Sequence, residues 1–393
     1  MKKYIISIAV FFVCLSAGAA ITEKYVSSSA NEGTSDGTSG APYSFAEMVT
    51  EINAGSAAGN RYNIKDDGTY TLGATVNLTA GGTQTAPVIL RGYTTTITDG
   101  YLGRSPENGV LVTTNMPLIE FSSTSFNLTM TGDYIVFENL QLSASTSGTA
   151  WNSDTGCVFL NCKISSSSTN SAGVALSVGN RSSAINCDVF MTGASSGTAA
   201  IIASTTMSRI IGCRVNVTST AAWTIRLTGA TVVVDNMLIG GAGLRLNSAS
   251  AVPFIYGNTI VNSSTDAISM VTTMDGPQFI MNNHITDNAG DGIDMFGTGN
   301  SGVILWNRLR DNGTSIANGN DWQTVLALGQ VDDGTTGDTS TDYVDYGAGD
   351  YRLKATAPGT SAGFPTQRTI GAFQLNQEGS VGGSSETSHT FVK

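Results

Sequence analysis

The sequence contains little charge of either sign and few basic residues. Lys, Arg, Asp and Glu make up 12% of the 393 residues, with 19 basic against 30 acidic side chains. Loss of Lys2 and Lys3 with the N-terminal segment described next leaves 17 basic residues, which gives a net charge of 17 − 30 = −13. A chain so acidic is a poor partner for nucleic acid or for an anionic membrane surface.

Long apolar runs are absent outside the first twenty residues, MKKYIISIAVFFVCLSAGAA. Two lysines are followed there by an apolar core over 4–15 and by small residues at 17–20, the pattern of a secretory signal peptide. The core falls short of the roughly 18 residues that span a bilayer, so a membrane anchor is the less favoured alternative. We therefore expect residues 1–20 to be removed. The mature protein would be secreted, extracellular or on the cell surface, with no membrane insertion.

Cysteine is scarce. Four remain after such processing: Cys157, Cys162, Cys187 and Cys213. An even number of cysteines in an exported chain permits disulfides, but the repeat described next offers a competing explanation.

An internal repeat runs through the middle of the chain. Eight segments, from VFENLQL at 136–142 to ILWNRL at 304–309, align without gaps at spacings of 21 to 26 residues. Two positions after the central column every segment has an aliphatic residue. The central column is Leu140, Cys162, Cys187, Cys213, Met237, Asn258, Asn283 and Asn307.

A period near 24 with β-branched residues and no helical spacing indicates a coil of short strands. The fold class we predict is all-β: a single-stranded right-handed parallel β-helix (a solenoid) with an N-terminal capping helix. The position before the central column holds mainly Asn or Gly, which tolerate left-handed backbone angles, so the chain should bend there. Trp306 departs from this pattern.

The central column should face the core. Three equivalent cysteines stacked in parallel cannot all pair, so buried free thiols are the favoured interpretation of Cys162, Cys187 and Cys213. One bridge, between adjacent rungs or with Cys157, stays open. The asparagines at 258, 283 and 307 should continue the column as an internal amide ladder.

The ends of the coil divide the chain. Residues 21–43 should form a loosely held lead-in, and Ser44-Phe45-Ala46-Glu47 is a capping box that predicts a helix over 44–54. The β-helix domain with its caps should span 44–374, closed by 340–373. Residues 375–393 are Gly/Ser-rich and should be a flexible tail.

Several segments carry a family resemblance: VFENLQL, YGNTIVNS, NNHITDNAGDGIDM and the closing YVDYGAGDYRLKATAPGTSAG…IGAF. They resemble the right-handed parallel β-helix proteins of the pectate-lyase-like superfold, of secreted bacterial or phage type. The resemblance covers most of 44–374. It implies the fold but not one function, because this fold hosts lyases, hydrolases, epimerases, adhesins and phage tail spikes.

A second strand column places polar residues outward at Arg226, Arg245, Ser269 and Asp294, beside equivalent turn residues Asp266 and Asp291. Polysaccharide lyases of this superfold use carboxylate-bound calcium and an Arg or Lys base. The resemblance thus implies calcium at Asp266 and Asp291, with Asp294 as a further ligand, and Arg245 as base. Asp291 and Asp294 could instead be a glycosidase pair. The catalytic candidates are Arg245, Asp291 and Asp294.

Other outward positions suggest substrate contacts. His284 and Arg308 join Arg226 and Arg245 as candidate substrate-binding residues. Scaffold roles compete with these functions: Asp287 and Asp291 could bind turn backbone, and His284 could be an ordinary surface residue. Another outward column, Lys163, Asp188 and Arg214, fits a charge ladder on a solvated sheet.

The favoured function is a secreted β-helix that interacts with an extracellular or cell-surface polysaccharide, as a non-catalytic binding or structural protein. One alternative is a polysaccharide lyase or glycoside hydrolase acting on an acidic glycan. Another is a phage-type tail spike or fibre, or an adhesin. The sparse charges and the lack of the Gly-His-Gly and Arg-Ile-Lys motifs of polygalacturonase-like enzymes favour the non-catalytic interpretation. The glycan and the oligomeric state stay open.

Overall fold

The computed structural model describes residues 21–353, except 31–33, 106–107, 146–147, 168–172, 194–197, 205, 249–251, 272–277, 296–300, 315, 318–323, 329–330, 333–342 and 346–349. The expected signal peptide over 1–20, the flexible tail over 375–393 and most of the expected closing segment lie outside the described residues.

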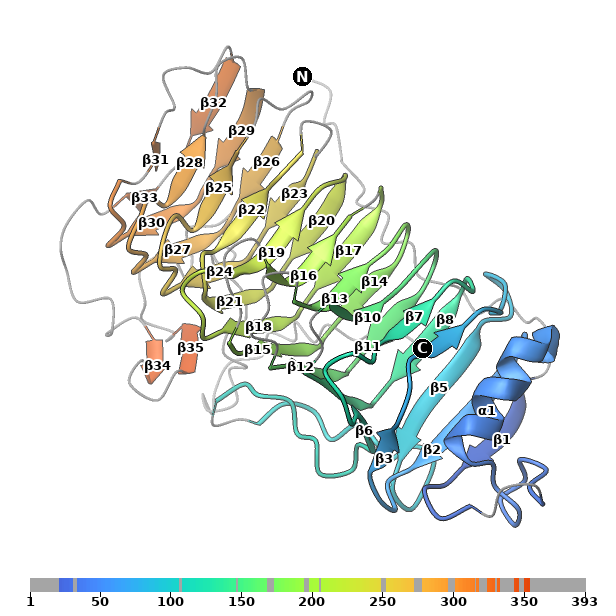
Figure 1. Ribbon diagram of the computed structural model, residues 1–393. Helices are drawn as coiled ribbons and strands as arrows, with labels where there is room; N and C mark the ends of the chain where they lie inside the picture. The colour runs from blue at the N-terminus through green and yellow to red at the C-terminus, as the bar shows by residue number, and fades with distance from the viewer. Residues whose placement is uncertain are drawn as a thin grey trace, which may run out of the picture.

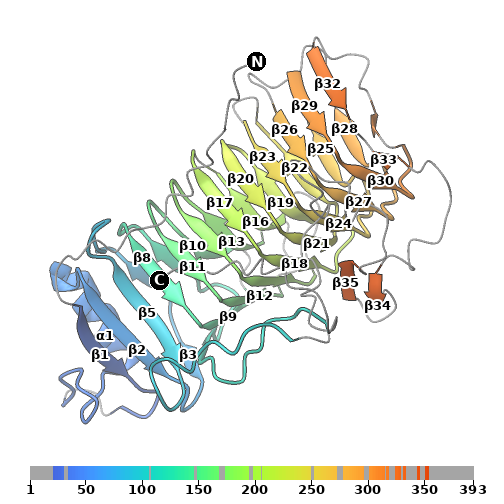
Figure 2. The same ribbon diagram turned by 180° about the vertical axis from the view of Figure 1, so that it is seen from behind.

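Short strands follow one another around a coil and stack into three parallel sheets (Figures 1 and 2). Sheet A contains β1 (Thr22–Val26), β2 (Asn60–Lys65), β5 (Val88–Tyr93), β8 (Ile135–Glu138), β11 (Val158–Leu160), β14 (Ser183–Ile185), β17 (Ser208–Ile211), β20 (Thr231–Val234), β23 (Phe254–Tyr256), β26 (Gln278–Met281), β29 (Ser301–Leu305) and β32 (Thr324–Leu328). Sheet B contains β3 (Tyr70–Leu72), β6 (Leu118–Phe121), β9 (Gln141–Ala144), β12 (Lys163–Ser166), β15 (Asp188–Met191), β18 (Arg214–Val217), β21 (Met237–Gly240), β24 (Thr259–Val261), β27 (His284–Thr286), β30 (Arg308–Arg310) and β33 (Val331–Asp332). Sheet C contains β4 (Val76–Leu78), β7 (Leu128–Met130), β10 (Thr149–Asn152), β13 (Val174–Val178), β16 (Ala199–Ala203), β19 (Trp223–Leu227), β22 (Leu244–Leu246), β25 (Ile268–Met270), β28 (Ile293–Met295) and β31 (Ile316–Ala317).

This arrangement confirms the predicted all-β parallel β-helix. Aliphatic and aromatic side chains from all three sheets fill one continuous core. Near the C-terminal end, β34 (Tyr343–Asp345) and β35 (Asp350–Leu353) form a separate antiparallel pair. No helix in the described part of the chain is long and apolar enough to cross a membrane.

The N-terminal end differs in part from the expectation. Helix α1 (Phe45–Glu51) begins after Ser44, whose Oγ accepts a hydrogen bond from Glu47 N while the Glu47 carboxylate accepts one from Ser44 N. A π-type turn over Ile52–Ser56 follows the helix. Within the segment 21–43 that the sequence predicts as a lead-in, residues 22–26 form β1 and pair in register with β2.

The bend between sheets A and B uses left-handed backbone, as the sequence predicts. Residues at this corner have φ between 52° and 68°: Asn139, Asn161, Asn186, Gly212, Asp235, Gly257, Asn282 and Trp306. Trp306 adopts the same bend as the asparagines, so the rung it belongs to is not distorted at this point.

One rung of the sequence alignment was wrong by one residue. Asp235, not Asn236, takes the bend, and Met237 pairs with Thr259. Asn236 therefore belongs to the central column, and Met237 does not. The slip arose because Met237 and Ile239 supply the apolar pattern one residue later than Asn236 and Leu238.

The central column is buried, and its thiol and amide side chains form hydrogen bonds along the coil axis. Cys162, Cys187 and Cys213 are free thiols with no exposed surface. Each Sγ lies 3.4–3.5 Å from a carbonyl oxygen of the preceding rung, at Phe137, Phe159 and Ala184 in turn. The asparagines that continue the column donate to the equivalent carbonyl oxygens of their preceding rungs. Thiol and amide side chains therefore make equivalent hydrogen bonds in this column.

Candidate functional site

The outer face of sheet C carries the polar row expected from the sequence. Arg226 of β19 pairs in register with Arg245 of β22, and Ser269 of β25 and Asp294 of β28 follow on successive strands. The residues that flank each of them on the strand point into the core and are buried. Pleated strands alternate their side chains between two faces, so this row faces outward.

An aromatic residue that the sequence analysis missed joins this row. The guanidinium of Arg245 lies over the indole ring of Trp223, 4.9 Å from its centroid. Cation–π contact of this kind fixes the arginine and leaves its remaining N–H groups for a ligand. Trp223 is half-buried at the start of β19, where the preceding strands carry Ala199 and Val174 at the equivalent position. No repeat pattern therefore marks it.

Burial affects both arginines. It lowers the pKa of Arg226, and burial followed by the charge of Arg226 lowers the pKa of Arg245. Among the described residues no carboxylate forms an ion pair with Arg245, whereas Arg61, Arg91 and Arg104 pair with Glu23, Glu138 and Asp188. Two neighbouring cations removed in part from water are costly, and such groups gather at functional sites.

At the other end of the row lie the turn residues Asp266 and Asp291, for which the family resemblance implies calcium. Asp266 Oδ1 accepts a hydrogen bond of 2.8 Å from Asp291 N, which ties one turn to the next. Among the described residues no three carboxylate, imidazole or thiol side chains come together to hold a metal ion. Calcium at Asp266 and Asp291 stays a hypothesis, and we assign no step to it. Asp291 in the turn and Asp294 on β28 are half-buried, and their role as a glycosidase pair stays a hypothesis.

His284 and Arg308 do not lie on the surface, contrary to the expectation. They pair in register on β27 and β30, each one position after a residue of the central column and therefore on the outer side of the sheet. Neither residue has any exposed surface. Burial, with the charges of Arg308 and Arg310, holds the pKa of His284 well below its usual value of 6.5. In this structure neither side chain is available to a polysaccharide.

The surface charge ladder expected at Lys163, Asp188 and Arg214 is also wrong, because Asp188 is covered. The segment between β5 and β6 crosses the outer face of sheet B (Figure 1), where Arg104 pairs with Asp188 and Leu111 N donates to Asp188 Oδ2 at 2.7 Å. Asp188 has no exposed surface. Its carboxylate anchors this segment.

The acidic stretch 281–297 is largely explained as scaffold. Asn282 makes the left-handed bend and Asn283 belongs to the core ladder. Asp287 makes a second left-handed bend, and Asn288 Nδ2 donates to Asn312 Oδ1 at 2.7 Å in a second ladder. Of its charged residues, Asp294 alone lies in the outward row of sheet C.

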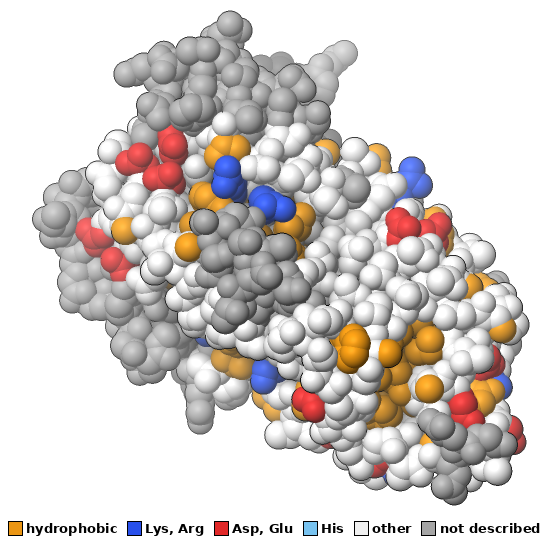
Figure 3. All heavy atoms as spheres, viewed as in Figure 1, with side chains coloured by type: hydrophobic (Ala, Val, Ile, Leu, Met, Phe, Trp, Pro, Cys, Tyr) orange, Lys and Arg blue, Asp and Glu red, His pale blue; other side chains and the backbone are white. Residues whose placement is uncertain are grey.

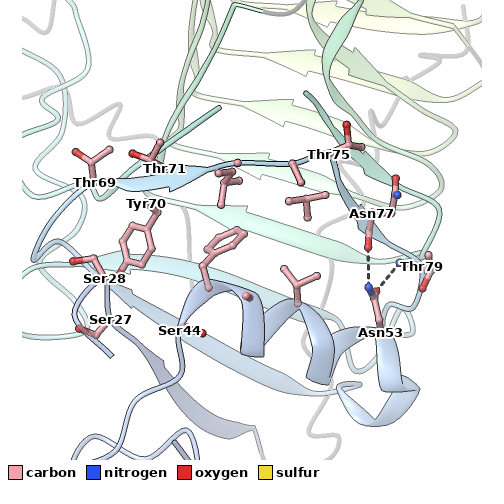
Figure 4. A pocket seen from close by; sticks show the side chains of 17 residues that line it. Ser27, Ser28, Ser44, Asn53, Thr69, Tyr70, Thr71, Thr75, Asn77 and Thr79 are labelled. Atoms are coloured by element: carbon pink, nitrogen blue, oxygen red, sulfur yellow. Dashed lines mark hydrogen bonds between the residues drawn. The ribbon is translucent and has the colours of Figure 1, made fainter. Parts of the chain in front are cut away.

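A hollow of about 730 Å³ opens at the N-terminal end, between α1 and the edge strands β3 and β4 (Figure 4). Its floor is apolar, with Phe45, Val49 and Leu72. The Asn53 side chain donates to Asn77 O and accepts from Thr79 N, both at 2.8 Å. It thus satisfies backbone groups in and directly after β4 that a neighbouring strand would otherwise pair with. The hollow lies outside the sheet C row.

The face of the molecule seen in Figure 3 is mostly uncharged, and its few charged side chains lie in small groups. This fits the low charge of the sequence.

Comparison with known proteins bears on the fold. No protein-family model and no curated protein sequence matches the chain. Among solved structures, it is similar to "pectate lyase Pel9A", with a TM-score of 0.61 and 16% identity over 91% of this chain and 97% of that one. It is also similar to a "rhamnogalacturonan lyase", with a TM-score of 0.55 and 12% identity over 82% and 91% of the two chains. The chain has the pectate-lyase-like right-handed β-helix fold. At these identities the likeness shows the fold alone.

Proposed function

We propose that the protein is a secreted binder of a carboxylate-bearing polysaccharide, which it holds on the outer face of sheet C. The observation that carries this proposal is the Arg245 guanidinium, packed on Trp223 beside Arg226 and without an ion pair among the described residues. The two structural neighbours, a pectate lyase and a rhamnogalacturonan lyase, support a carbohydrate as ligand.

The chemistry of the row suits an acidic sugar. A guanidinium binds a carboxylate through two parallel N–H bonds, and its hydration is weak enough for partial burial. The indole of Trp223 adds a flat apolar surface next to these donors. Ser269, which is almost fully buried, and Asp294 continue the row along the same face.

A polysaccharide-binding measurement tests the proposal. The full chain would be titrated with polygalacturonate, alginate and a neutral glucan, with and without calcium, by affinity electrophoresis and calorimetry. Loss of charge-assisted hydrogen bonds should weaken binding of an acidic glycan roughly 10- to 100-fold in Arg245→Ala. The matched control is Arg209→Ala on β17 of sheet A, which should bind normally. Failure to bind any acidic glycan, or equal binding by Arg245→Ala, would overturn the proposal.

A second candidate is a polysaccharide lyase in which Arg245 removes the proton next to the uronate carboxyl group. Burial and the charge of Arg226 lower the pKa of Arg245, which is the direction that a general base requires. Cleavage by elimination leaves an unsaturated uronate, so the same glycans would be followed by ultraviolet absorbance. A product that accumulates with the native chain but not with Arg245→Ala would establish a lyase. Binding without product would leave the non-catalytic function.

A further inference from the structure

The outer face of sheet A changes in character along the coil. Near the N-terminal end it carries two ion pairs, Arg61 with Glu23 and Arg91 with Glu138. From β11 to β29 the strands of this sheet lie side by side (Figure 1), and their outward positions are almost all apolar. The apolar strip, as we call these positions, consists of Val158, Leu160, Ser183, Ile185, Arg209, Ile211, Val232, Val234, Phe254, Tyr256, Phe279, Met281, Val303 and Leu305.

The apolar strip faces out of the coil. Its members alternate along each strand with core residues such as Phe159 and Ile280, which have no exposed surface. Side chains of a pleated strand point alternately to its two sides, so the strip lies on the outer side of the sheet. Every member except Ser183 and Leu305 is partly exposed, and Arg209 is its one charged member.

Exposed apolar residues lie along both long edges of the strip. Five large apolar side chains are largely exposed among the described residues, and four of them are here. Met207 directly precedes β17 and is 58% exposed, and Val252 lies two residues before β23. On the other edge, Tyr101 Oη accepts a hydrogen bond of 2.9 Å from Asn186, at the bend after β14, and Leu102 comes next in the chain. Apolar groups thus continue from the face to its margins, which is typical of a protein interaction surface.

We propose that a second copy of this chain covers the apolar strip, so that the protein is a dimer with two-fold symmetry. In a two-fold contact the same patch of both chains meets itself, and a flat apolar face fulfils this condition without matched charges. The middle strand of the strip is β20, which places Val232 and Val234 near the centre of the contact.

The size of the strip fits such a contact. Its seven strands are separated by six steps of roughly 4.8 Å, which is about 29 Å along the coil. Four residues of a strand extend about 13 Å, which gives a planar area of about 380 Å² before the edges are counted. A stable interface buries about 800 Å² on each partner, with an apolar core inside a polar rim. The strip has the size of such a core, and the residues at its margins add to the area.

Other occupants fit the strip less well. A peptide strand docks on the free edge of a sheet, whereas the strands of the strip pair with neighbours on both sides. A sugar chain is oriented by several polar groups, and the strip offers only Arg209, the Tyr256 hydroxyl and the buried Ser183. An anionic membrane surface repels an acidic chain.

Salt should strengthen this dimer. Each chain is acidic, so two copies repel one another at long range, and added salt screens the repulsion. The burial of apolar surface that favours association does not depend on charge. A contact made by ion pairs would weaken in salt, so the direction of the salt effect distinguishes the two kinds of contact.

Sedimentation velocity over a range of micromolar concentrations, at low and moderate salt, tests the proposal. The purified protein should change from the mass of one chain to that of two as its concentration rises, and at lower concentration in added salt. Val234→Asp places a carboxylate from each copy at the centre of the contact. It should weaken association at least about 100-fold, because neither charge gains a partner there.

A matched control and a milder variant keep the test decisive. Phe190→Asp introduces the same charge at a partly exposed outward position of β15 in sheet B and should dimerise like the native protein. Val232→Thr combined with Val234→Thr keeps the shape and the strand preference of valine, so this variant should fold normally by circular dichroism. Its added hydroxyl groups should still weaken association at least about tenfold.

Each outcome supports or overturns the dimer. A protein that stays a single chain at every concentration overturns it, as does a dimer that survives both changes at the strip or is lost equally in Phe190→Asp. Binding of single native chains to neutral phospholipid vesicles, abolished in Val234→Asp, would assign the strip to a lipid surface instead. Arg245→Ala on sheet C should dimerise like the native chain, so the dimer and the proposed polysaccharide binding are tested separately.

Discussion

Asn258 Nδ2 donates a hydrogen bond to Asn283 Oδ1 at 2.9 Å, and the backbone N–H of Asn258 donates to the same oxygen at 3.0 Å. Asn283 repeats both bonds toward Asn307 one rung further along. Each amide also donates to a carbonyl of the preceding rung, at Val233 for Asn258 and Ile255 for Asn283. The ladder therefore satisfies buried amides and fixes the register of neighbouring rungs.

Replacing Asn283 by Ala should destabilise the coil strongly. The change removes the acceptor of both the Asn258 backbone N–H and one Asn258 Nδ2–H, and it removes the side-chain bonds that Asn283 donates to Asn307 Oδ1 and Ile255 O, all in the core. Each buried polar group left unsatisfied costs about 1–3 kcal/mol, so we expect a total loss of about 3–5 kcal/mol in the free energy of unfolding. Urea unfolding followed by circular dichroism measures it. Asn180→Ala, at a partly exposed turn, is the control, and equal losses in the two variants would contradict the role of the ladder.

The sequence was sufficient to predict the coil, because each rung repeats the same inward and outward pattern. The sequence alignment placed the rung of Asn236 one residue too late, because the apolar residues Met237 and Ile239 have the same spacing as the inward positions Asn236 and Leu238. It also placed Asp188 and His284 on the surface. Parity within a strand tells on which side of a sheet a residue lies but not what covers that side. Asp188 is covered by Arg104 and Leu111, which lie more than seventy positions earlier in the chain.

The candidate site was predicted only in part for a similar reason. The row Arg226, Arg245, Ser269 and Asp294 follows from strand alternation, and the structure confirms its register. Trp223 was missed because the equivalent residues in preceding rungs are small. Its contact with Arg245 joins two rungs through side-chain conformations that a repeat pattern does not specify.

The thiol of Cys213 should be almost unreactive in the folded chain. Burial, followed by the neighbouring Cys187, raises its pKa well above the usual value of 9.0 for a thiol. Thiolate is the reactive form, so labelling must await opening of the coil. We expect native-state labelling of the three stacked cysteines by a disulfide reagent to be at least about 100-fold slower than in urea. Thr71→Cys supplies an exposed control thiol, and equal rates for the control and the stacked cysteines would refute the buried column.

The carboxylate of Asp188 should hold the segment between β5 and β6 against sheet B. It pairs with Arg104 and accepts from Leu111 N, and it has no exposed surface. Breaking a buried pair leaves a charge uncompensated, so Asp188→Asn should cost about 3–5 kcal/mol locally. Hydrogen exchange of residues 108–115 should accelerate in this variant while exchange in β19 to β27 stays unchanged. Asp154→Asn, at an exposed position, is the control. Unchanged exchange at 108–115 would show that other contacts hold the segment.

His284 should make folding stability depend on pH in the range above the titration of most carboxylates. The folded pKa lies well below 6.5 because of burial, with Arg308 and Arg310 adding repulsion. The unfolded chain takes up the proton near pH 6.5 whereas the folded chain does not, so protons stabilise the unfolded state. The contribution of His284 is complete above that pH and is lost as pH falls, by up to about 1.4 kcal/mol per pH unit.

The pH profile of unfolding free energy in native protein and two variants tests this expectation. The native chain should lose stability between pH 7 and pH 5.5, and His284→Gln should show a flatter profile whatever its absolute stability. His389→Gln, which removes the other histidine of the sequence, should keep the native slope. Slope is the decisive quantity, because a variant that merely packs poorly shifts the whole curve without changing the number of protons bound on unfolding. A native slope retained in His284→Gln would mean that the proton is taken up elsewhere.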